Sequence, residues 1–250
     1  MSRLKGKVAF VTGAGGGIGR AVCQQFLAEG ALVAAVDIDA DVAEAAVSSA
    51  HSQATAIALQ CDVGDSASMR AAIAQVVSAF GSVNVLLNVA GGSTPQDGPV
   101  IDAPEEEFWR AIRLDLFGTF LCCKHGIPEL IKAGGGSVIN MTSMLALMGV
   151  PGRDCYTAAK GGVAAITRSM AVEFASHSIR VNAIAPGITL TDRVKARIDT
   201  SENMKKLSSR HLLGAAEPLD IAHLAVYLAS DESRIVTGQV LQVDSGVTIN

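Results

Sequence analysis

Short apolar runs alternate with longer segments of helical periodicity along most of this 250-residue chain, and no other feature limits its fold as strongly. Most of the runs are continuously apolar instead of alternating with polar residues, which is typical of parallel strands covered on both faces. The seven predicted strands are Val8–Thr12, Leu32–Asp37, Ala56–Gln60, Val83–Asn88, Ser137–Met141, Arg180–Ile184 and Gln239–Val243. The six predicted helices are Ile18–Glu29, Ala40–Ala50, Ser66–Phe80, Glu105–Ala133, Cys155–His177 and Pro218–Ser230.

The repeated strand–helix–strand order predicts an α/β fold with a doubly wound parallel sheet between two layers of helices. No Pro/Ser-rich linker, charge block or internal repeat divides the chain, so we expect one domain over residues 1–250. Two long loop segments, 91–103 and 187–214, follow strands at the carboxyl edge of the sheet. Ligands bind at this edge in such folds, and long loops in compact domains are usually functional or mobile.

The composition argues against several classes of protein. A net charge of −4 disfavours nucleic acid as the main partner, because that partner calls for clustered Lys and Arg. No apolar run approaches the roughly 18 residues that cross a membrane, and the N-terminus has no signal-peptide pattern. Five cysteines without a Cys-x-x-Cys pair and five scattered histidines favour neither a disulfide framework nor a metal site. We therefore expect a soluble, cytoplasmic protein that uses no metal.

The first predicted strand ends in Thr12-Gly-Ala-Gly-Gly-Gly-Ile-Gly19, and a helix begins at once. Glycines such as Gly13, Gly17 and Gly19 let the backbone approach a pyrophosphate, which unpaired N–H groups at the helix N-terminus bind. The spacing differs from the Gly-x-Gly-x-x-Gly of the longer dehydrogenases, and a simple tight strand–helix turn is the alternative. The position between the first strand and the first helix favours a dinucleotide site.

Asp37 ends the second predicted strand, 18 residues beyond Gly19. A carboxylate there can accept hydrogen bonds from both ribose hydroxyls and would repel a 2′-phosphate, which predicts NAD as the cofactor instead of NADP. The alternative is that Asp37 only caps the next helix. After the third strand, Asp62 and Val63 are placed to bracket an adenine ring.

A candidate catalytic group follows the fifth strand. Tyr156 and Lys160 are four residues apart on a predicted helix and share one face, and Ser143 lies just past the strand. A phenol has a pKa of about 10, which an adjacent ammonium and a positively charged nicotinamide would lower. Tyr156 can then move a proton while Ser143 binds the substrate oxygen, without a metal. The alternative is a packed Tyr156 beside a solvated Lys160.

Taken in chain order, these motifs make the sequence resemble the short-chain dehydrogenase/reductase family along essentially its whole length. The matching pieces are Thr12-Gly-x-x-x-Gly-Ile-Gly19, Asp62, Asn88-Val-Ala-Gly91, Ser143, Tyr156-x-x-x-Lys160, Asn182-Ala-Ile-Ala-Pro-Gly187 and Thr191. The resemblance implies a Rossmann-type sheet of strand order 3-2-1-4-5-6-7, Ser–Tyr–Lys chemistry, a mobile substrate loop at about 187–214 and a homotetramer. The small residues around Ala158 and Gly161 would let the helix of Tyr156 approach the same helix of another subunit closely.

The resemblance also implies roles for individual residues. Lys160 would bond the nicotinamide ribose as well as tuning Tyr156, the backbone around Ile188 would contact the nicotinamide amide, and Thr191 would contact the carboxamide or a phosphate. The expected cofactor-binding residues are Gly13, Gly17, Ile18, Gly19, Asp37, Asp62, Val63, Asn88, Ala90, Gly91, Tyr156, Lys160, Pro186, Gly187, Ile188 and Thr191.

The chain departs from the family pattern at three positions. Asp115 stands where the family usually has an Asn that helps to hold a water in the proton relay from Lys. A carboxylate there would either stabilise the ammonium of Lys160 or trap it in an ion pair, and simple support of the helix is the alternative. Val89 replaces the second Asn of Asn-Asn-Ala-Gly, and Ser245 replaces a Gly near the C-terminus.

The residues around the catalytic group predict an apolar substrate wall. Arg153 would either bind a substrate carboxylate or form a surface salt bridge. His211 and Arg210, in the substrate loop, are expected to be solvated, and a binding role is the alternative. The wall is expected from Met144, Leu145, Leu147, Met148 and Val150, closed over by Leu190, Val194 and the loop 92–98.

The expected function is NAD-dependent oxidation of a secondary alcohol to a ketone, or the reverse, with Ser143, Tyr156, Lys160 and Asp115 as the catalytic set. A 3-oxoacyl-thioester reductase is an alternative with the same motifs, although such a role usually draws on NADPH, which Asp37 disfavours. A catalytically weak NAD-binding sensor or scaffold subunit is the alternative from another class, supported by the departures at Asp115 and Val89.

Overall fold

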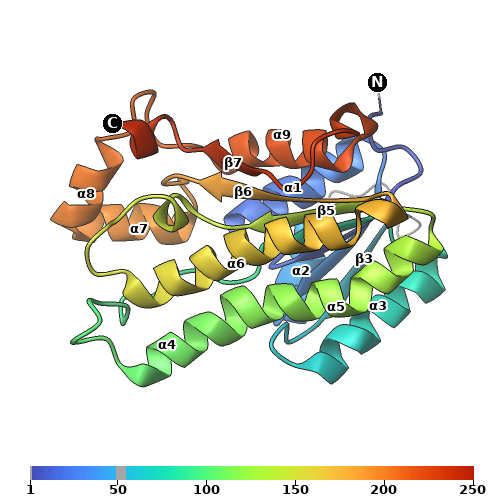
Figure 1. Cartoon of the computed structure of the whole chain (residues 1–250), viewed down its shortest axis with the longest axis horizontal. Coiled ribbons are helices and arrows are strands. Elements are labelled where there is room, and N and C mark those ends of the chain that lie inside the picture. The colour runs from blue at the N-terminus through green and yellow to red at the C-terminus, as the bar shows by residue number, and fades with distance from the viewer. Residues whose placement is uncertain (1, 49–54) are drawn as a thin grey trace.

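The computed structural model describes residues 2–48 and 55–250, and in them seven parallel strands form one sheet in the order β3-β2-β1-β4-β5-β6-β7 (Figure 1). The predicted α/β fold and strand order are therefore confirmed. The strands are β1 Val8–Thr12, β2 Leu32–Asp37, β3 Ala56–Gln60, β4 Val85–Asn88, β5 Gly136–Met141, β6 Ile179–Pro186 and β7 Val240–Val243. The α-helices are α1 Gly17–Ala28, α2 Ala40–Val47, α3 Ser66–Phe80, α4 Glu105–Ala111, α5 Gly118–Lys132, α6 Asp154–Glu173, α7 Asp192–Thr200, α8 Glu202–Ser208 and α9 Pro218–Ala229. The end of the predicted helix Ala40–Ala50, residues 49 and 50, lies outside the described residues.

Each face of the sheet buries its own apolar core. Alternate residues of a strand point to opposite faces, so in β1 Ala9 and Val11 pack with α1, α2 and α9, whereas Val8 and Phe10 pack with α3, α5 and α6. Figure 1 shows the resulting layers, with α1 and α9 on one side of the strands and α3 and α5 on the other. Because every residue of β1 is buried, the strand appears in the sequence as a continuous apolar run.

Local signals fix where several helices begin and end. The side chain of Asp39 accepts hydrogen bonds from the first turn of α2, and Asp65 does the same for α3. Gly81 ends α3 in the left-handed conformation, with φ of 81°. The two aspartate caps lie in strand–helix turns at the carboxyl edge of the sheet, whereas Gly81 lies at the opposite edge, between α3 and β4.

The predicted helix Glu105–Ala133 is divided into three segments. Between α4 and α5 the chain is π-helical over η1, Ile112–Phe117. A π-helical turn adds one residue to the helix, and this changes the spacing of apolar residues too little to be recognised in the sequence. Such turns frequently lie at functional sites. This one carries Asp115, which is fully buried.

The segment 187–214, predicted as a loop, contains the two short helices α7 and α8. Thr191 and Ser201 cap them by accepting hydrogen bonds from the backbone N–H groups of Val194 and Met204. The polar composition of the segment hid these helices, because only a few apolar residues on each one pack against the protein. Four of them, Val194, Ile198, Met204 and Leu207, contact a small core formed by Met144, Leu145, Ile188 and Val247.

Three short 3-10 turns, η3 Ala175–His177, η4 Asp231–Ser233 and η5 Val247–Ile249, complete the chain together with η2, Met144–Ala146, which follows β5. None of the helices in the described part of the chain combines the length and apolar character needed to cross a membrane.

Candidate active site

A large cavity opens at the carboxyl edge of the sheet, where the segments that follow β1 to β6 meet. Its volume of about 1210 Å³ exceeds the roughly 300–1,000 Å³ of most small-molecule pockets, so it has room for a dinucleotide and a substrate. Of the predicted site residues, Asn88 and Asp115 are buried and do not line it. The others all do: Gly13, Gly17, Ile18, Gly19, Asp37, Asp62, Val63, Ala90, Gly91, Ser143, Tyr156, Lys160, Pro186, Gly187, Ile188 and Thr191.

The glycine-rich turn after β1 presents bare backbone to the cavity. Gly13 has φ of 65°, and a Cβ atom there would lie 2.8 Å from the main chain of Ala90, so only glycine fits. No side chain caps the N-terminus of α1, which begins at Gly17, and its first N–H groups are therefore available to an anion. Thr191 packs directly on Gly17. These features fit the pyrophosphate of a dinucleotide.

Asp37 faces this turn and is not a helix cap. Its Oδ2 accepts a hydrogen bond of 3.0 Å from the backbone N–H of Gly15, while the cap of α2 is Asp39. A basic group also lies nearby, because Arg20 donates from Nη2 to the carbonyl of Gly15 at 3.3 Å. The structure therefore excludes the capping alternative and adds a cation that the sequence analysis did not consider.

Asp62 is held in place at the end of β3. Its Oδ1 accepts from the N–H of Gly64 at 2.8 Å, and its Oδ2 accepts from Nη2 of Arg113 at 2.6 Å. Val63 is buried beside Gly118. Both predicted adenine contacts thus lie in the cavity, and Arg113 is a second polar side chain beside them that the motif did not reveal.

Lys160 is a buried cation with two fixed partners. Its Nζ donates to the carbonyl of Met141 at 2.9 Å, lies 3.0 Å from Oδ1 of Asp115, and is 5.5 Å from the centre of the Tyr156 ring. Only 2% of the residue is exposed. The solvated alternative for Lys160 is therefore wrong.

The groups of the chain itself raise the pKa of Tyr156 above its ordinary value. The predicted lowering also counted the charge of a bound nicotinamide, and for the cofactor complex it stays a prediction. Burial raises it most, Lys160 lowers it, and Asp115 raises it again, while hydrogen bonding to Ser143 and the charge of Arg193 lower it. The predicted contribution of the ammonium is present, but burial and the nearby carboxylate outweigh it. The sequence predicts Asp115 near Lys160, but the effect of its carboxylate on the phenol depends on the packed structure.

Asp115 connects the π-helical turn to the loop after β4. Its Oδ1 also accepts from the N–H of Gly92 at 2.8 Å, and its carbonyl accepts from Oγ1 of Thr119 at 2.9 Å. Gly91 has φ of 127° and lies so close that a Cβ atom would collide with the carboxylate. Burial lowers the pKa of Lys160, but Asp115 and Tyr156 raise it more, so the net shift is upward and the ammonium is retained.

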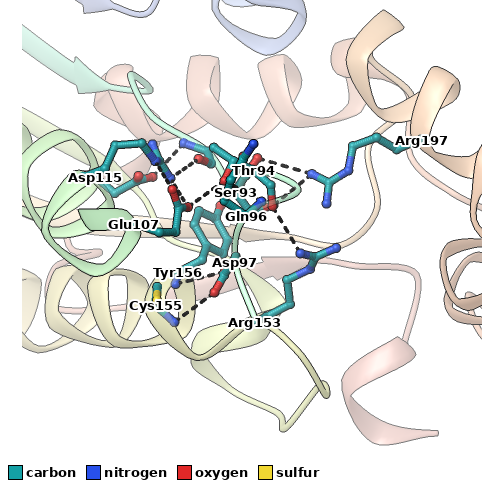
Figure 2. A network of polar contacts seen from close by, with 12 residues as sticks. Ser93, Thr94, Gln96, Asp97, Glu107, Asp115, Arg153, Cys155, Tyr156 and Arg197 are labelled. Atoms are coloured by element: carbon teal, nitrogen blue, oxygen red, sulfur yellow. Dashed lines mark hydrogen bonds and ion pairs between the residues drawn. The ribbon is translucent and has the colours of Figure 1, made fainter. Parts of the chain in front are cut away.

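Asp97, in the loop after β4, caps the helix that carries the catalytic group. Its Oδ1 accepts from the N–H of Cys155 at 3.1 Å, and its Oδ2 accepts from the N–H of Tyr156 at 3.2 Å (Figure 2). A carboxylate at a helix N-terminus also stabilises the helix dipole. No sequence motif pointed to this residue, because the contact joins segments almost sixty positions apart.

Asn88 lies in the core beneath the cavity instead of in its wall. Its Nδ2 donates to Oδ1 of Asn140 at 2.9 Å, in a chain that continues through Nδ2 of Asn140 to Thr167. The N–H groups of Val89 and Ala90 donate to Oγ1 of Thr12 at 3.2 and 3.4 Å. Thr12 thereby steadies the backbone at the position where the family's second Asn is missing.

His211 is buried, so the prediction of a solvated residue is wrong. Its Nδ1 donates to the carbonyl of Leu207 at 3.1 Å, and its Nε2 accepts from the N–H of Ile188 at 2.9 Å. The carbonyl of Ile188 accepts from the N–H of Ala216 at 2.9 Å. A carboxamide that contacts Ile188 would therefore use the second lone pair of its carbonyl or displace His211.

The predicted substrate wall is formed in part. Met144, Leu145, Val150 and Val194 line the cavity, whereas Leu147 is 41% exposed and does not. Within residues 2–48 and 55–250, no group of three or more His, Cys, Asp or Glu side chains is arranged to hold a metal ion. The cavity wall beside Tyr156 is apolar where Met144, Leu145 and Val150 line it, and polar where Arg153, Arg193 and Arg197 line it.

The sequence was compared with models of protein families and with known proteins, and both comparisons match nearly the whole chain. The family model described as enoyl-(acyl carrier protein) reductase matches residues 13–248. The 2,5-dichloro-2,5-cyclohexadiene-1,4-diol dehydrogenase of Sphingobium indicum is 38% identical over 252 residues, which cover 99% of each chain.

Two solved structures share the fold over nearly the whole chain. A putative short-chain dehydrogenase/reductase from Burkholderia xenovorans superposes with a TM-score of 0.92 at 35% identity, covering 99% of this chain and 98% of the other. A 7α-hydroxysteroid dehydrogenase complexed with NADH and 7-oxo glycochenodeoxycholic acid gives a TM-score of 0.91 at 35% identity, covering 98% and 95%. With the glycine-rich turn and the Ser–Tyr–Lys wall facing one cavity, the chain belongs to the short-chain dehydrogenase/reductase family of Rossmann-fold oxidoreductases.

Proposed function

We propose that the protein catalyses the NAD-dependent oxidation of a secondary alcohol to a ketone, or the reverse reduction. The observation that carries this proposal is the convergence of Ser143, Tyr156 and Lys160 on the cavity that begins at the glycine-rich turn. The relatives support it, since one is named for the oxidation of a cyclic diol and another was solved with NADH and a keto steroid.

The residues of this chain fit a nicotinamide dinucleotide. The uncapped N-terminus of α1 suits the pyrophosphate, Asp37 suits the hydroxyls of the adenine ribose, and Asp62 with Val63 suits the adenine. Lys160 and Tyr156 would hold the nicotinamide ribose, with the remaining contacts from Ala90, Gly91, Pro186–Ile188 and Thr191. When bound, the nicotinamide exchanges a hydride with the carbinol carbon.

Tyr156 is the group that we assign to proton transfer. In oxidation the phenolate takes the hydroxyl proton of the alcohol, and in reduction the phenol returns it to the carbonyl oxygen. Ser143 donates a hydrogen bond to that oxygen, and Lys160 keeps a positive charge beside the phenolate. Asp115 is a positioning residue, because it acts through other groups: it holds Lys160 and the backbone of Gly92, and its charge raises the pKa of Tyr156.

Residues 187–214, with α7 and α8, form the substrate lid in this proposal, because their apolar side chains close the cavity over Met144 and Leu145. We also propose a homotetramer. Apolar patches on a surface mark association sites, and α4, η1 and α5 expose Trp109 at 63% together with the stacked rings of Phe117 and Phe120. A cytoplasmic location, where thiols stay reduced, is consistent with five unpaired cysteines.

The test is an absorbance assay of NADH formation with a panel of secondary alcohols. We expect turnover with NAD at a kcat/KM about 10²-fold above that with NADP, because like charges at Asp37 and a 2′-phosphate cost several kcal/mol. Asp37→Asn should reduce that ratio to roughly tenfold or less, with Asp41→Asn, an exposed residue of α2, as the control.

Equal use of NADP by the wild-type protein would contradict the choice of cofactor and give Arg20 the deciding role. Tight NAD binding without turnover of any alcohol would favour a sensor subunit. In the reverse direction, a preference for 3-oxoacyl or enoyl thioesters would replace the proposed alcohol substrate.

Asp115→Asn should shift the pH profile of activity toward lower pH. Asp115 raises the pKa of Tyr156, after the larger effects of burial and Lys160, so removal of its charge lowers that pKa. Oxidation needs the phenolate, and its kcat/KM should therefore reach its plateau at lower pH. Reduction needs the phenol, and its decline should also begin at lower pH. Initial rates measured across pH in both directions test this, and superimposable profiles would leave Asp115 with a purely structural role.

A further inference from the structure

Three arginines gather at the substrate end of the cavity, beside Tyr156. Arg153 precedes α6, and Arg193 and Arg197 lie on α7, and all three line the cavity. Figure 2 shows Arg153 and Arg197 reaching from opposite segments to the loop of Ser93 and Thr94, next to the Tyr156 ring. Of these three arginines, only Arg153 was predicted from the sequence as a candidate for binding a substrate carboxylate.

Two of the arginines, Arg153 and Arg197, are held by neutral hydrogen-bond partners. Nη1 of Arg153 donates to the carbonyl of Thr94 at 3.3 Å, and Nη1 of Arg197 donates to the carbonyl and hydroxyl of Ser93 at 3.2 and 3.1 Å. In the part of the chain that the structure describes, none of the three forms an ion pair with a carboxylate. The surface salt bridge considered for Arg153 is therefore absent there, and several guanidinium N–H donors remain for a ligand.

Asp97 also lines this end of the cavity, but it forms no ion pair with any of the three arginines. Asp97 is close enough to affect Arg197, but both of its carboxylate oxygens accept hydrogen bonds from the first turn of α6. Around this end of the cavity the other charged lining residues are Asp192, Lys206 and Arg210 besides Lys160. A chain of net charge −4 thus concentrates positive charge at one end of its cavity.

The positions of Arg193 and Arg197 destabilise the helix that carries them, α7. Arg193 and Arg197 are like charges at positions i and i+4 of one helix, which destabilises it, and Arg193 lies in the first turn, where the helix dipole disfavours a cation. Burial, Arg153 and Arg193 all lower the pKa of Arg197. Departures from local stability rules are expected where residues serve a ligand.

We propose that the substrate carries an anionic group, best represented by a carboxylate, which Arg153 and Arg197 bind with support from Arg193. This inference rests on the proposed oxidoreductase function and adds its substrate class. Guanidinium groups bind carboxylates through paired, charge-assisted hydrogen bonds. The apolar wall of Met144, Leu145 and Val150 faces the same space, so the substrate combines a hydrophobic body, a secondary alcohol and an acid. The phosphates of the cofactor are expected at the opposite end, on α1.

The test compares hydrophobic secondary alcohols that bear a free carboxylate with their methyl esters, at saturating NAD. We expect kcat/KM of the wild-type protein to favour the acid at least tenfold and this preference to shrink with added salt. The double variant Arg153→Gln/Arg197→Gln should bring the ratio close to one through a loss of kcat/KM for the acid. Arg234→Gln, which removes an exposed arginine outside the cavity lining, is the matched control.

Binding measurements test the same site without turnover. Calorimetric titration of the NADH complex with phenylacetate and phenylacetamide should detect the acid as the tighter ligand, and the double variant should lose this difference while binding NADH as the wild type does.

Equal binding of the acid and the amide, or no detectable binding of either, would overturn the anion site. Equal turnover of acids and esters would overturn it and leave the alcohol dehydrogenase proposal standing. Weaker NADH binding by the double variant, with the preference for acids intact, would assign the arginines to the cofactor instead. Absence of turnover with every alcohol would contradict only the proposed function, and the titration would still decide the anion site.

Discussion

Replacing Tyr156 by phenylalanine is expected to lower kcat about 10²- to 10⁴-fold, the range for loss of a positioned general acid or base. The ring keeps its packing among Met144, Leu145 and Ile188, so the variant should fold normally. Lys160 keeps both of its partners, Met141 and Asp115, because neither contact involves the phenol. The loss should therefore appear mainly in kcat, while NADH affinity should fall by no more than about tenfold through loss of the single ribose contact of the phenol. Fluorescence titration beside steady-state rates measures both.

The chain provides its own control, since it contains only two tyrosines. Tyr227 lies on α9 and does not line the cavity, so Tyr227→Phe should retain full activity. Retention of more than a tenth of wild-type kcat by Tyr156→Phe would show that another group moves the proton, and Ser143 would then be the first alternative to test.

The sheet was predictable because its strands are covered on both faces and must be apolar along their whole length. β1, β2 and β3 have the predicted bounds, and β6 extends the predicted strand by at most two residues at each end. The helices of the lid escaped prediction for the opposite reason. α7 and α8 bury only one narrow side, and their polar residues outnumber the apolar contacts that hold them.

The candidate site likewise has residues that the sequence predicts and residues that only the structure reveals. Ser143, Tyr156 and Lys160 are close in sequence or one helical turn apart, so local spacing was enough to group them. The contacts of Asp97 with α6 and of Arg197 with Ser93 join distant segments, and only the packed chain brings them together. Burial also determines the direction in which the pKa of Tyr156 shifts, and a sequence motif does not show how deeply a side chain is buried. Two signals for the anion site were available in the sequence: Arg153, a candidate for binding a substrate carboxylate, and the spacing of Arg193 and Arg197.

Replacing Lys160 by methionine should lower the free energy of unfolding by about 3–5 kcal/mol, which is the usual effect of removing one partner from a buried ion pair. For a chain of this length that corresponds to a fall in Tm of roughly 6–20 °C. The ammonium is the only cation paired with Asp115 among the described residues. Without it, Oδ1 keeps the N–H of Gly92, while Oδ2 is buried with no hydrogen-bond partner.

The charge left behind, and not the lost side chain, is the cause of this effect, and a second substitution separates the two. Lys160→Met/Asp115→Leu removes both charges and should regain much of the lost stability, since apolar replacement of a buried pair is often neutral or stabilising. It should have little activity, because the ammonium that lies beside the Tyr156 ring is gone. Lys132→Met, which breaks the exposed pair with Glu129, should change stability by no more than about 1 kcal/mol. Thermal and urea unfolding of all four proteins distinguishes the outcomes. If the single variant were as stable as the wild type, or the double variant no more stable than the single one, water would reach Asp115. The ion pair would then not be isolated from solvent.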